Sequence, residues 1–95
     1  MTKDIVAIRA VVRGRVQGVG FRDYVETHAR MLRLTGSVRN LDDGRAVEVI
    51  AEGPRESLEQ LIRHLYEGPR MSRVDAVDVE WRGATGQFAD FRTAF

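Results

Sequence analysis

The sequence predicts an α+β sandwich in which two helices cover one face of a mainly antiparallel sheet. Two stretches carry apolar residues at helical spacing, and the stretches around them alternate apolar and polar residues as strands do. The expected order is strand, helix, strand, strand, helix and strand, followed by a short strand at the C-terminus. Because each amphipathic helix needs a sheet face to cover, this order predicts the ferredoxin-like split βαβ arrangement. Since 95 residues suffice for one compact domain and not for two, residues 1–95 are expected to form a single domain.

The first half of the chain is expected to contain two strands, a glycine-rich loop and a helix. Ile5 to Arg13 is predicted to be a strand, because apolar residues recur there at every second position. Gly14 to Gly20 follows as a loop with three glycines. The helix after this loop carries an apolar stripe formed by Phe21, Val25, Ala29 and Leu32. Leu34 to Asn40 is then predicted to be a short second strand.

The second half is expected to hold a hairpin turn, a strand, a helix, a long strand, a polar connection and a short final strand. In that order the segments are Leu41–Gly44, Ala46–Glu52, a helix with Pro54 in its first turn and Gly68 at its end, Val74–Arg82, Gly83–Asp90 and Phe91–Phe95. In the strand after the turn, Glu48 and Glu52 are expected to point outward, away from the apolar face.

The net charge of the chain is close to zero, which argues against partners that bind a protein through its overall electrostatic field. Fifteen basic and 14 acidic residues give a net charge of +1, so neither nucleic acid nor an anionic membrane is an expected partner. The chain has no cysteine, which excludes disulfides and thiolate chemistry. Asp4 stands where a signal peptide would begin its apolar run, and Ile5 to Ala10 is too short to span a membrane. We therefore expect a soluble cytoplasmic protein, and we expect it to be a monomer.

The segment that predicts chemistry is Gly14 to Arg22, which joins a strand to a helix. Helix N-termini expose N–H groups and attract anions, and Gly18 and Gly20 allow successive N–H groups to converge. Arg22, in the first helical turn, can add a forked cationic donor. A tight turn that merely needs glycine is the alternative, and neither the P-loop nor the dinucleotide-binding fingerprint fits the residues after Gly20.

Gly14 to Arg22, read as GRVQGVGFR, resembles the complete signature loop of the acylphosphatase family. Gly36 to Asn40 resembles the second signature of that family, and further matches follow at Asp43-Gly44, Val47-Glu48, Gly68-Pro69 and Val74. The resemblance implies a ferredoxin-like fold and an enzyme that hydrolyses acyl phosphates to a carboxylate and inorganic phosphate. Two departures stand out. Ser37 occupies a position where the family usually has an aromatic residue, and one extra residue lies near Arg45-Ala46.

The resemblance also implies the site residues. Arg22 and Asn40 would be catalytic, with the Asn40 side chain holding the attacking water. The phosphoryl group, or inorganic phosphate or sulfate as a product-like ligand, would bind the loop residues Arg15, Val16, Gln17, Gly18, Val19, Gly20, Phe21 and Arg22. A carboxylate leaves easily, so positioning and charge stabilisation suffice. No metal and no other cofactor is expected, since the sequence has only two histidines and no cluster of ligands.

Two other functions compete with hydrolysis. RNA-recognition modules share this element order, but they stack bases on central-strand aromatics, and Arg45 to Glu52 contains none. A regulatory or carbamoyl-phosphate-handling domain is the second alternative, because acylphosphatase-like domains occur within larger maturation proteins. The chain begins and ends near the expected domain edges, which favours a free-standing enzyme.

Several polar residues are assigned structural roles rather than catalytic ones. His28 is expected to pack beside the apolar stripe of its helix, and His64 is expected to be solvated. Asp42 and Asp43 are expected to form the hairpin turn. Arg39 should point to the sheet face opposite Asn40, since neighbouring strand residues alternate.

Overall fold

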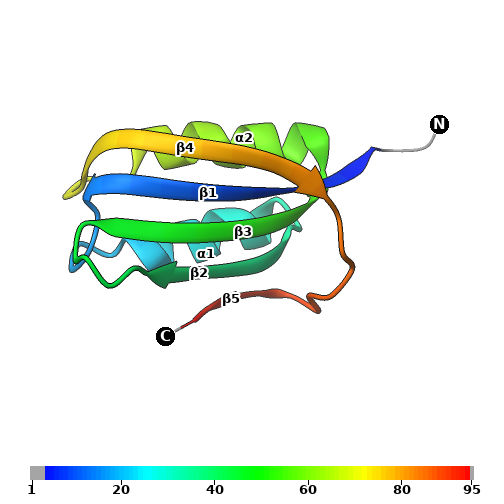
Figure 1. Cartoon of the computed structure of the whole chain (residues 1–95), viewed down its shortest axis with the longest axis horizontal. Coiled ribbons are helices and arrows are strands. Elements are labelled where there is room, and N and C mark those ends of the chain that lie inside the picture. Colours follow the sequence, from blue (N-terminus) through cyan, green and yellow to red (C-terminus); the bar gives the residue numbers. More distant parts are fainter. Residues whose placement is uncertain (1–3, 95) are drawn as a thin grey trace.

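A computed structural model describes residues 4–94 of the chain. Its elements are β1 (Ile5–Arg15), α1 (Phe21–Met31), β2 (Thr35–Asn40), β3 (Ala46–Pro54), α2 (Arg55–Glu67), β4 (Arg73–Gly83) and β5 (Phe91–Thr93). They form one five-stranded sheet in the order β4-β1-β3-β2-β5, as Figure 1 shows. The β2–β5 pairing is parallel and the other pairings are antiparallel. The predicted ferredoxin-like α+β fold is therefore confirmed.

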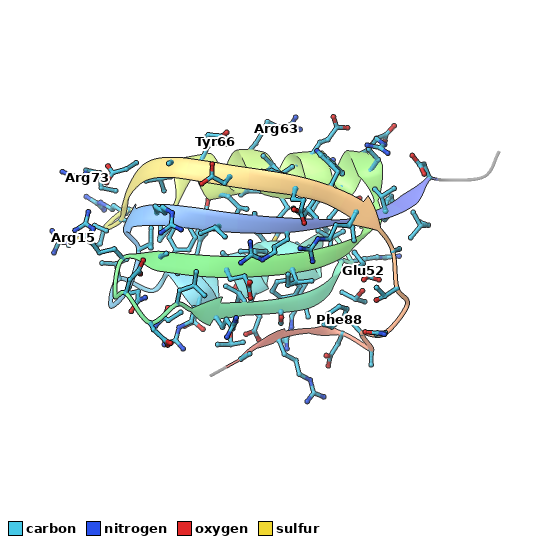
Figure 2. The ribbon with its side chains drawn as sticks, in the orientation of Figure 1. Arg15, Glu52, Arg63, Tyr66, Arg73 and Phe88 are labelled. Carbon is cyan, nitrogen blue, oxygen red and sulfur yellow. The ribbon has the colours of Figure 1, made fainter. Side chains whose placement is uncertain are left out.

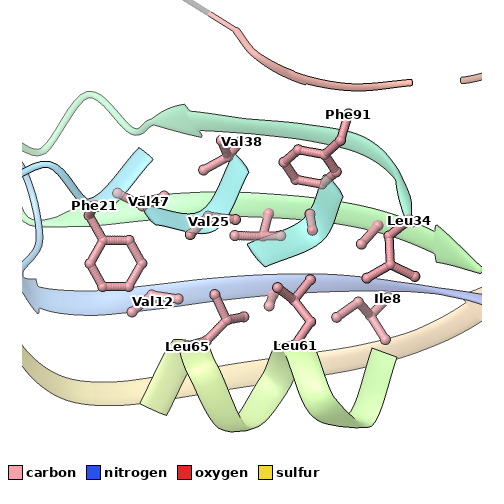
Figure 3. Close-up of a cluster of buried hydrophobic side chains, with 14 of the residues drawn as sticks. Ile8, Val12, Phe21, Val25, Leu34, Val38, Val47, Leu61, Leu65 and Phe91 are labelled. Atoms are coloured by element: carbon pink, nitrogen blue, oxygen red, sulfur yellow. The ribbon is translucent and has the colours of Figure 1, made fainter. Parts of the chain in front are cut away.

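Both helices cover the same face of the sheet, and the core lies between the two layers (Figures 1 and 3). Helix α1 buries Phe21, Val25 and Ala29, and helix α2 buries Leu58, Leu61 and Leu65. The strands contribute alternate residues to this layer, because a strand presents every second side chain to one face. The fully buried strand residues include Ile8, Val12, Val38, Val47 and Val49.

The opposite sheet face carries charged pairs. Glu48 accepts hydrogen bonds from the Nε atoms of Arg9 and Arg39, each at 2.8 Å. Burial alone would raise the pKa of Glu48, but the hydrogen bonds and charges of these two arginines outweigh burial and lower it. As expected, Arg39 lies on the face away from the helices.

Glu52 points to this outer face, as predicted, yet it is buried there, with an exposed fraction of only 5%. The connection between β4 and β5 folds over the carboxylate, which accepts bonds from Thr85 N, Thr85 Oγ1 and Gly86 N at 2.7–3.1 Å (Figure 2). These bonds outweigh the effect of burial, which by itself would raise the pKa of Glu52, and they hold it below its ordinary value.

Several boundaries differ from those predicted. Strand β1 continues through Gly14 to Arg15, because β4 pairs with both residues. Pro54 has an extended ψ of 139° and ends β3, so α2 begins at Arg55 rather than at the proline.

The Trp81 side chain of β4 remains 40% exposed, and the Arg55 guanidinium carbon lies 4.9 Å from the centroid of the Trp81 ring.

Candidate active site

Residues 16–20 join β1 to α1, and we call them the anion loop. Gly18 and Gly20 have φ values of 73° and 78°, in the left-handed region that favours glycine. Apart from the adjacent residues, no atom of residues 4–94 lies within 4 Å of the place where a Cβ would stand on either glycine. Gly20 caps α1 and, as a glycine, has no side chain that could bond to the first turn. The first N–H groups of the helix are therefore available to an anion.

Gln17 fixes the anion loop against the β2–β3 hairpin. Its side-chain Nε2 donates to the carbonyl oxygens of Leu41 and Ala46, at 2.8 and 2.9 Å. An amide nitrogen has two hydrogens, so both donors are used. These bonds span 24 and 29 residues of sequence, and they bring the loop beside the end of β2, where Asn40 lies.

Asn40 supplies an unusual acceptor. It is the last residue of β2 and pairs with Val47 of β3. Its side-chain Oδ1 is buried and accepts no hydrogen bond from residues 4–94. A buried acceptor without a partner costs about 1–3 kcal/mol, so an orphan of this kind calls for a functional explanation.

Asn40 and Arg22 line the same cavity, which has a volume of about 340 Å³. The anion loop contributes Val16, Gly18 and Gly20 to its wall, and Phe21 adds the first residue of α1. The cavity thus combines glycine backbone at a helix N-terminus, a guanidinium group and an amide oxygen. Such a set can hold a phosphoryl group and orient a small polar molecule beside it.

Asp23, Glu26 and Thr93 also line this cavity, and none of them was predicted from the sequence. The Thr93 hydroxyl donates to the Glu26 carboxylate, and Arg30 Nη2 lies 3.0 Å from the same carboxylate. Arg30 Nε also donates to the Phe91 carbonyl at 3.1 Å, which ties β5 to α1. The spacing of residues 22, 23 and 26 on one side of a helix was an available signal for the acids, whereas nothing local points to Thr93.

Not every residue assigned to phosphate binding lies on this cavity. Arg15 and Gln17 line a separate hollow, and Val19 packs partly against the core. Of the eight residues assigned, Val16, Gly18, Gly20, Phe21 and Arg22 line the cavity with Asn40. The phosphate contacts of Arg15, Gln17 and Val19 stay predictions.

The two histidines lie away from the cavity, between the helices. The rings of His28 and His64 stack with centroids 3.9 Å apart, and Tyr24 donates its hydroxyl to the His64 carbonyl at 2.8 Å. The expectation that His64 would be solvated is wrong, because it is half-buried against His28. Burial, and secondarily the charge of His64, lower the pKa of His28, although Glu67 opposes the shift.

Among residues 4–94, no group of three or more His, Cys, Asp or Glu residues is arranged to hold a metal ion. None of the helices there is long and apolar enough to cross a membrane. Asp43 forms the hairpin turn as expected, since its Oδ1 accepts from Arg45 N at 2.9 Å.

Comparison with known proteins adds a family to this geometry. A family model described as Acylphosphatase matches residues 8–93. A curated acylphosphatase of Thermus thermophilus is 53% identical over 77 residues, covering 81% of this chain and 86% of the relative. One from Salinibacter ruber is 51% identical over 85 residues, covering 90% and 88%. The crystal structure of acylphosphatase from Bacillus subtilis superposes with a TM-score of 0.90 at 37% identity, covering 95% of this chain and 99% of that one.

Proposed function

This chain belongs to the acylphosphatase family and is an acylphosphatase, and on that premise we propose that Asn40 orients the water that attacks the substrate. The anion loop and the Arg22 guanidinium hold the phosphoryl oxygens. The water oxygen bonds to phosphorus while the bond from phosphorus to the acyl oxygen breaks. The products are a carboxylate and inorganic phosphate.

The observation that carries this proposal is the buried Oδ1 of Asn40. It lines the cavity that Arg22 and the anion loop share, and no group of residues 4–94 donates to it. An amide oxygen accepts a hydrogen bond from water and so aims the water lone pair, although it is too weak a base to remove the proton. A strong base is unnecessary, because the phosphoryl transition state is loose and a carboxylate departs readily. The positioning of the water and the phosphoryl group then supplies most of the rate enhancement.

We also propose that Arg22 stabilises the developing charge. Its position in the first turn of α1 places its charge at the end of the helix where the dipole already favours anions. A guanidinium offers two parallel donors to phosphoryl oxygens, which fixes orientation as well as charge. The reaction needs no metal in this account, so a chelator should leave turnover unchanged.

The remaining parts of the proposal concern the state of the protein. We propose one domain that acts as a monomer in the cytoplasm, takes small acyl phosphates and binds phosphate or sulfate as product-like ligands. Nucleic acid is not among its partners in this account. The arginines Arg9 and Arg39 on the outer sheet face are already engaged by Glu48, which leaves them poorly placed for phosphate backbones.

Hydrolysis in ¹⁸O-labelled water tests the site of attack. With acetyl phosphate as substrate, we expect one ¹⁸O atom in the released phosphate and none in the acetate, because the water attacks phosphorus. Mass spectrometry of both products reads out the label. Label in the acetate would mean attack at the carbonyl carbon, and the assigned role of Asn40 would then be wrong.

A further inference from the structure

A second hollow lies outside the Asn40 cavity, and we call it the arginine hollow. Its volume is about 350 Å³, within the range of small-molecule pockets. The end of β1, Gln17 of the anion loop, the turn between β2 and β3, and residues 71–73 at the start of β4 line it. Three of its side chains are arginines: Arg15, Arg45 and Arg73. Figure 2 shows Arg15 and Arg73 extending from the same end of the sheet.

An irregular register brings two of these arginines together. Arg13 of β1 pairs with Ala76 of β4, but the ladder then shifts, so that Arg15 lies directly opposite Arg73. Side chains directly opposite on antiparallel strands share a face, and like charges there destabilise the pair. Bulges of this kind recur beside functional sites, where they redirect side chains. The shift therefore gathers positive charge at a cost that binding an anion would offset.

Gly14 makes this arrangement possible. Its φ is 135°, and a Cβ on it would stand 2.2 Å from the Arg73 carbonyl oxygen. Only glycine allows β1 and β4 to approach so closely at the point where the register shifts. The backbone of Arg73 is consequently held against β1, next to Arg15.

The acids near the hollow do not balance the arginines. Asp75 is the one carboxylate that pairs with them among residues 4–94, at 3.6 Å from Arg45 and 3.2 Å from Arg73. No carboxylate in that range pairs with Arg15. Asp43, in the same hairpin as Arg45, forms its ion pair with Arg13 instead. Three guanidinium groups less one carboxylate leave a surplus of two positive charges.

We propose that the arginine hollow binds a small phosphate-bearing anion with at least two negative charges. Guanidinium groups suit this ligand, because their forked donors match phosphate oxygens. The hollow shares no lining residue with the proposed catalytic cavity, although Gln17 of the adjoining anion loop lines it. Its occupant need not react, so this inference goes beyond the proposed hydrolysis.

Titration with inorganic pyrophosphate, followed by NMR of the ¹⁵N-labelled chain, tests the proposal. We expect saturable shifts of the Arg15, Gly44, Arg45 and Arg73 amides and of the arginine Nε–H signals. These shifts should persist in Arg22→Ala, which weakens the catalytic cavity alone. The double variant Arg45→Gln/Arg73→Gln should lower the affinity at least several-fold and still hydrolyse acetyl phosphate.

Arg82→Gln is the matched control. Arg82 lies on the same strand as Arg73 and is also exposed, but it pairs with Glu80 and lies outside the hollow. The Arg82→Gln substitution removes one positive charge and should leave the pyrophosphate affinity unchanged. Shifts confined to residues 16–22 and lost in Arg22→Ala would overturn the proposal. So would equal shifts with sodium chloride at the same ionic strength, or equal weakening by Arg82→Gln.

Discussion

Two buried oxygen acceptors lie at opposite ends of the β2–β3 pair, and their surroundings differ sharply. Glu52, opposite Thr35, accepts hydrogen bonds from two backbone N–H groups and a hydroxyl of the β4–β5 connection. Asn40, opposite Val47, has an Oδ1 that accepts none from residues 4–94. The satisfied acceptor holds a connection in place. The acceptor without a partner lines a cavity beside the anion loop, so we infer that the attacking water is its partner.

Arg22→Ala should have the largest effect at the Asn40 end. Arg22 would contact the phosphoryl group before and during reaction, so its loss should reduce turnover by about 10²–10³-fold and also weaken phosphate inhibition. Arg22→Lys should not restore activity, because a point charge cannot reproduce the fork. Steady-state kinetics with acetyl phosphate and phosphate as inhibitor measure both effects. Near-normal activity of the lysine variant would contradict bidentate binding.

Glu52→Ala should affect stability and leave chemistry nearly intact. It removes the acceptor of Thr85 and Gly86, which should lower the free energy of unfolding by about 1–3 kcal/mol. Glu48→Ala is the matched control on the same strand, and it should cost less than about 1 kcal/mol, because its arginine partners are partly exposed. Urea denaturation of both variants measures the difference. If Glu52→Ala abolished turnover in a folded protein, the assignment of a structural role to Glu52 and a catalytic role to Asn40 would be wrong.

A smaller effect is expected in the pH dependence of stability. The pKa of Glu52 is lower in the folded protein than its ordinary value. The ionised carboxylate therefore contributes fully to the free energy of unfolding above the ordinary glutamate pKa, and this contribution is lost as the pH falls through the pKa of the folded state. Glu52→Gln should therefore flatten the loss of stability in acid. Melting temperatures between neutral and acid pH measure this slope. An unchanged slope would show that the Glu52 carboxylate is equally stabilised in the unfolded chain.

The regular parts of this fold could be predicted because their signals are local. Alternation at every second residue identified the strands, and the stripe from Phe21 to Ala29 identified α1. The anion loop was predictable for the same reason, since its glycines precede a helix directly. Its contact with the hairpin was not, because the Gln17 side chain reaches carbonyls 24 and 29 residues away.

Contacts between distant polar residues account for most of what the sequence did not reveal. The burial of Glu52 could not be predicted, because the connection that covers it begins more than 30 positions later, with Thr85 at a separation of 33. Thr93 and Glu26 are 67 positions apart, so the spacing of the acids on α1 gave no sign that Thr93 lies beside them. The register shift that sets Arg15 against Arg73 depends on the geometry of two paired strands, and a single strand carries no sign of it.

The most direct test of the central claim compares turnover with phosphate affinity in Asn40→Ala. If Asn40 orients water alone, turnover should fall by about 10²-fold or more, while the inhibition constant for phosphate stays within about twofold of its original value. Arg39→Ala, one residue earlier on the opposite sheet face, should retain near-normal turnover and so control for changes in β2. Near-normal turnover of Asn40→Ala, or a loss of phosphate affinity as large as that of Arg22→Ala, would contradict the assigned role of Asn40.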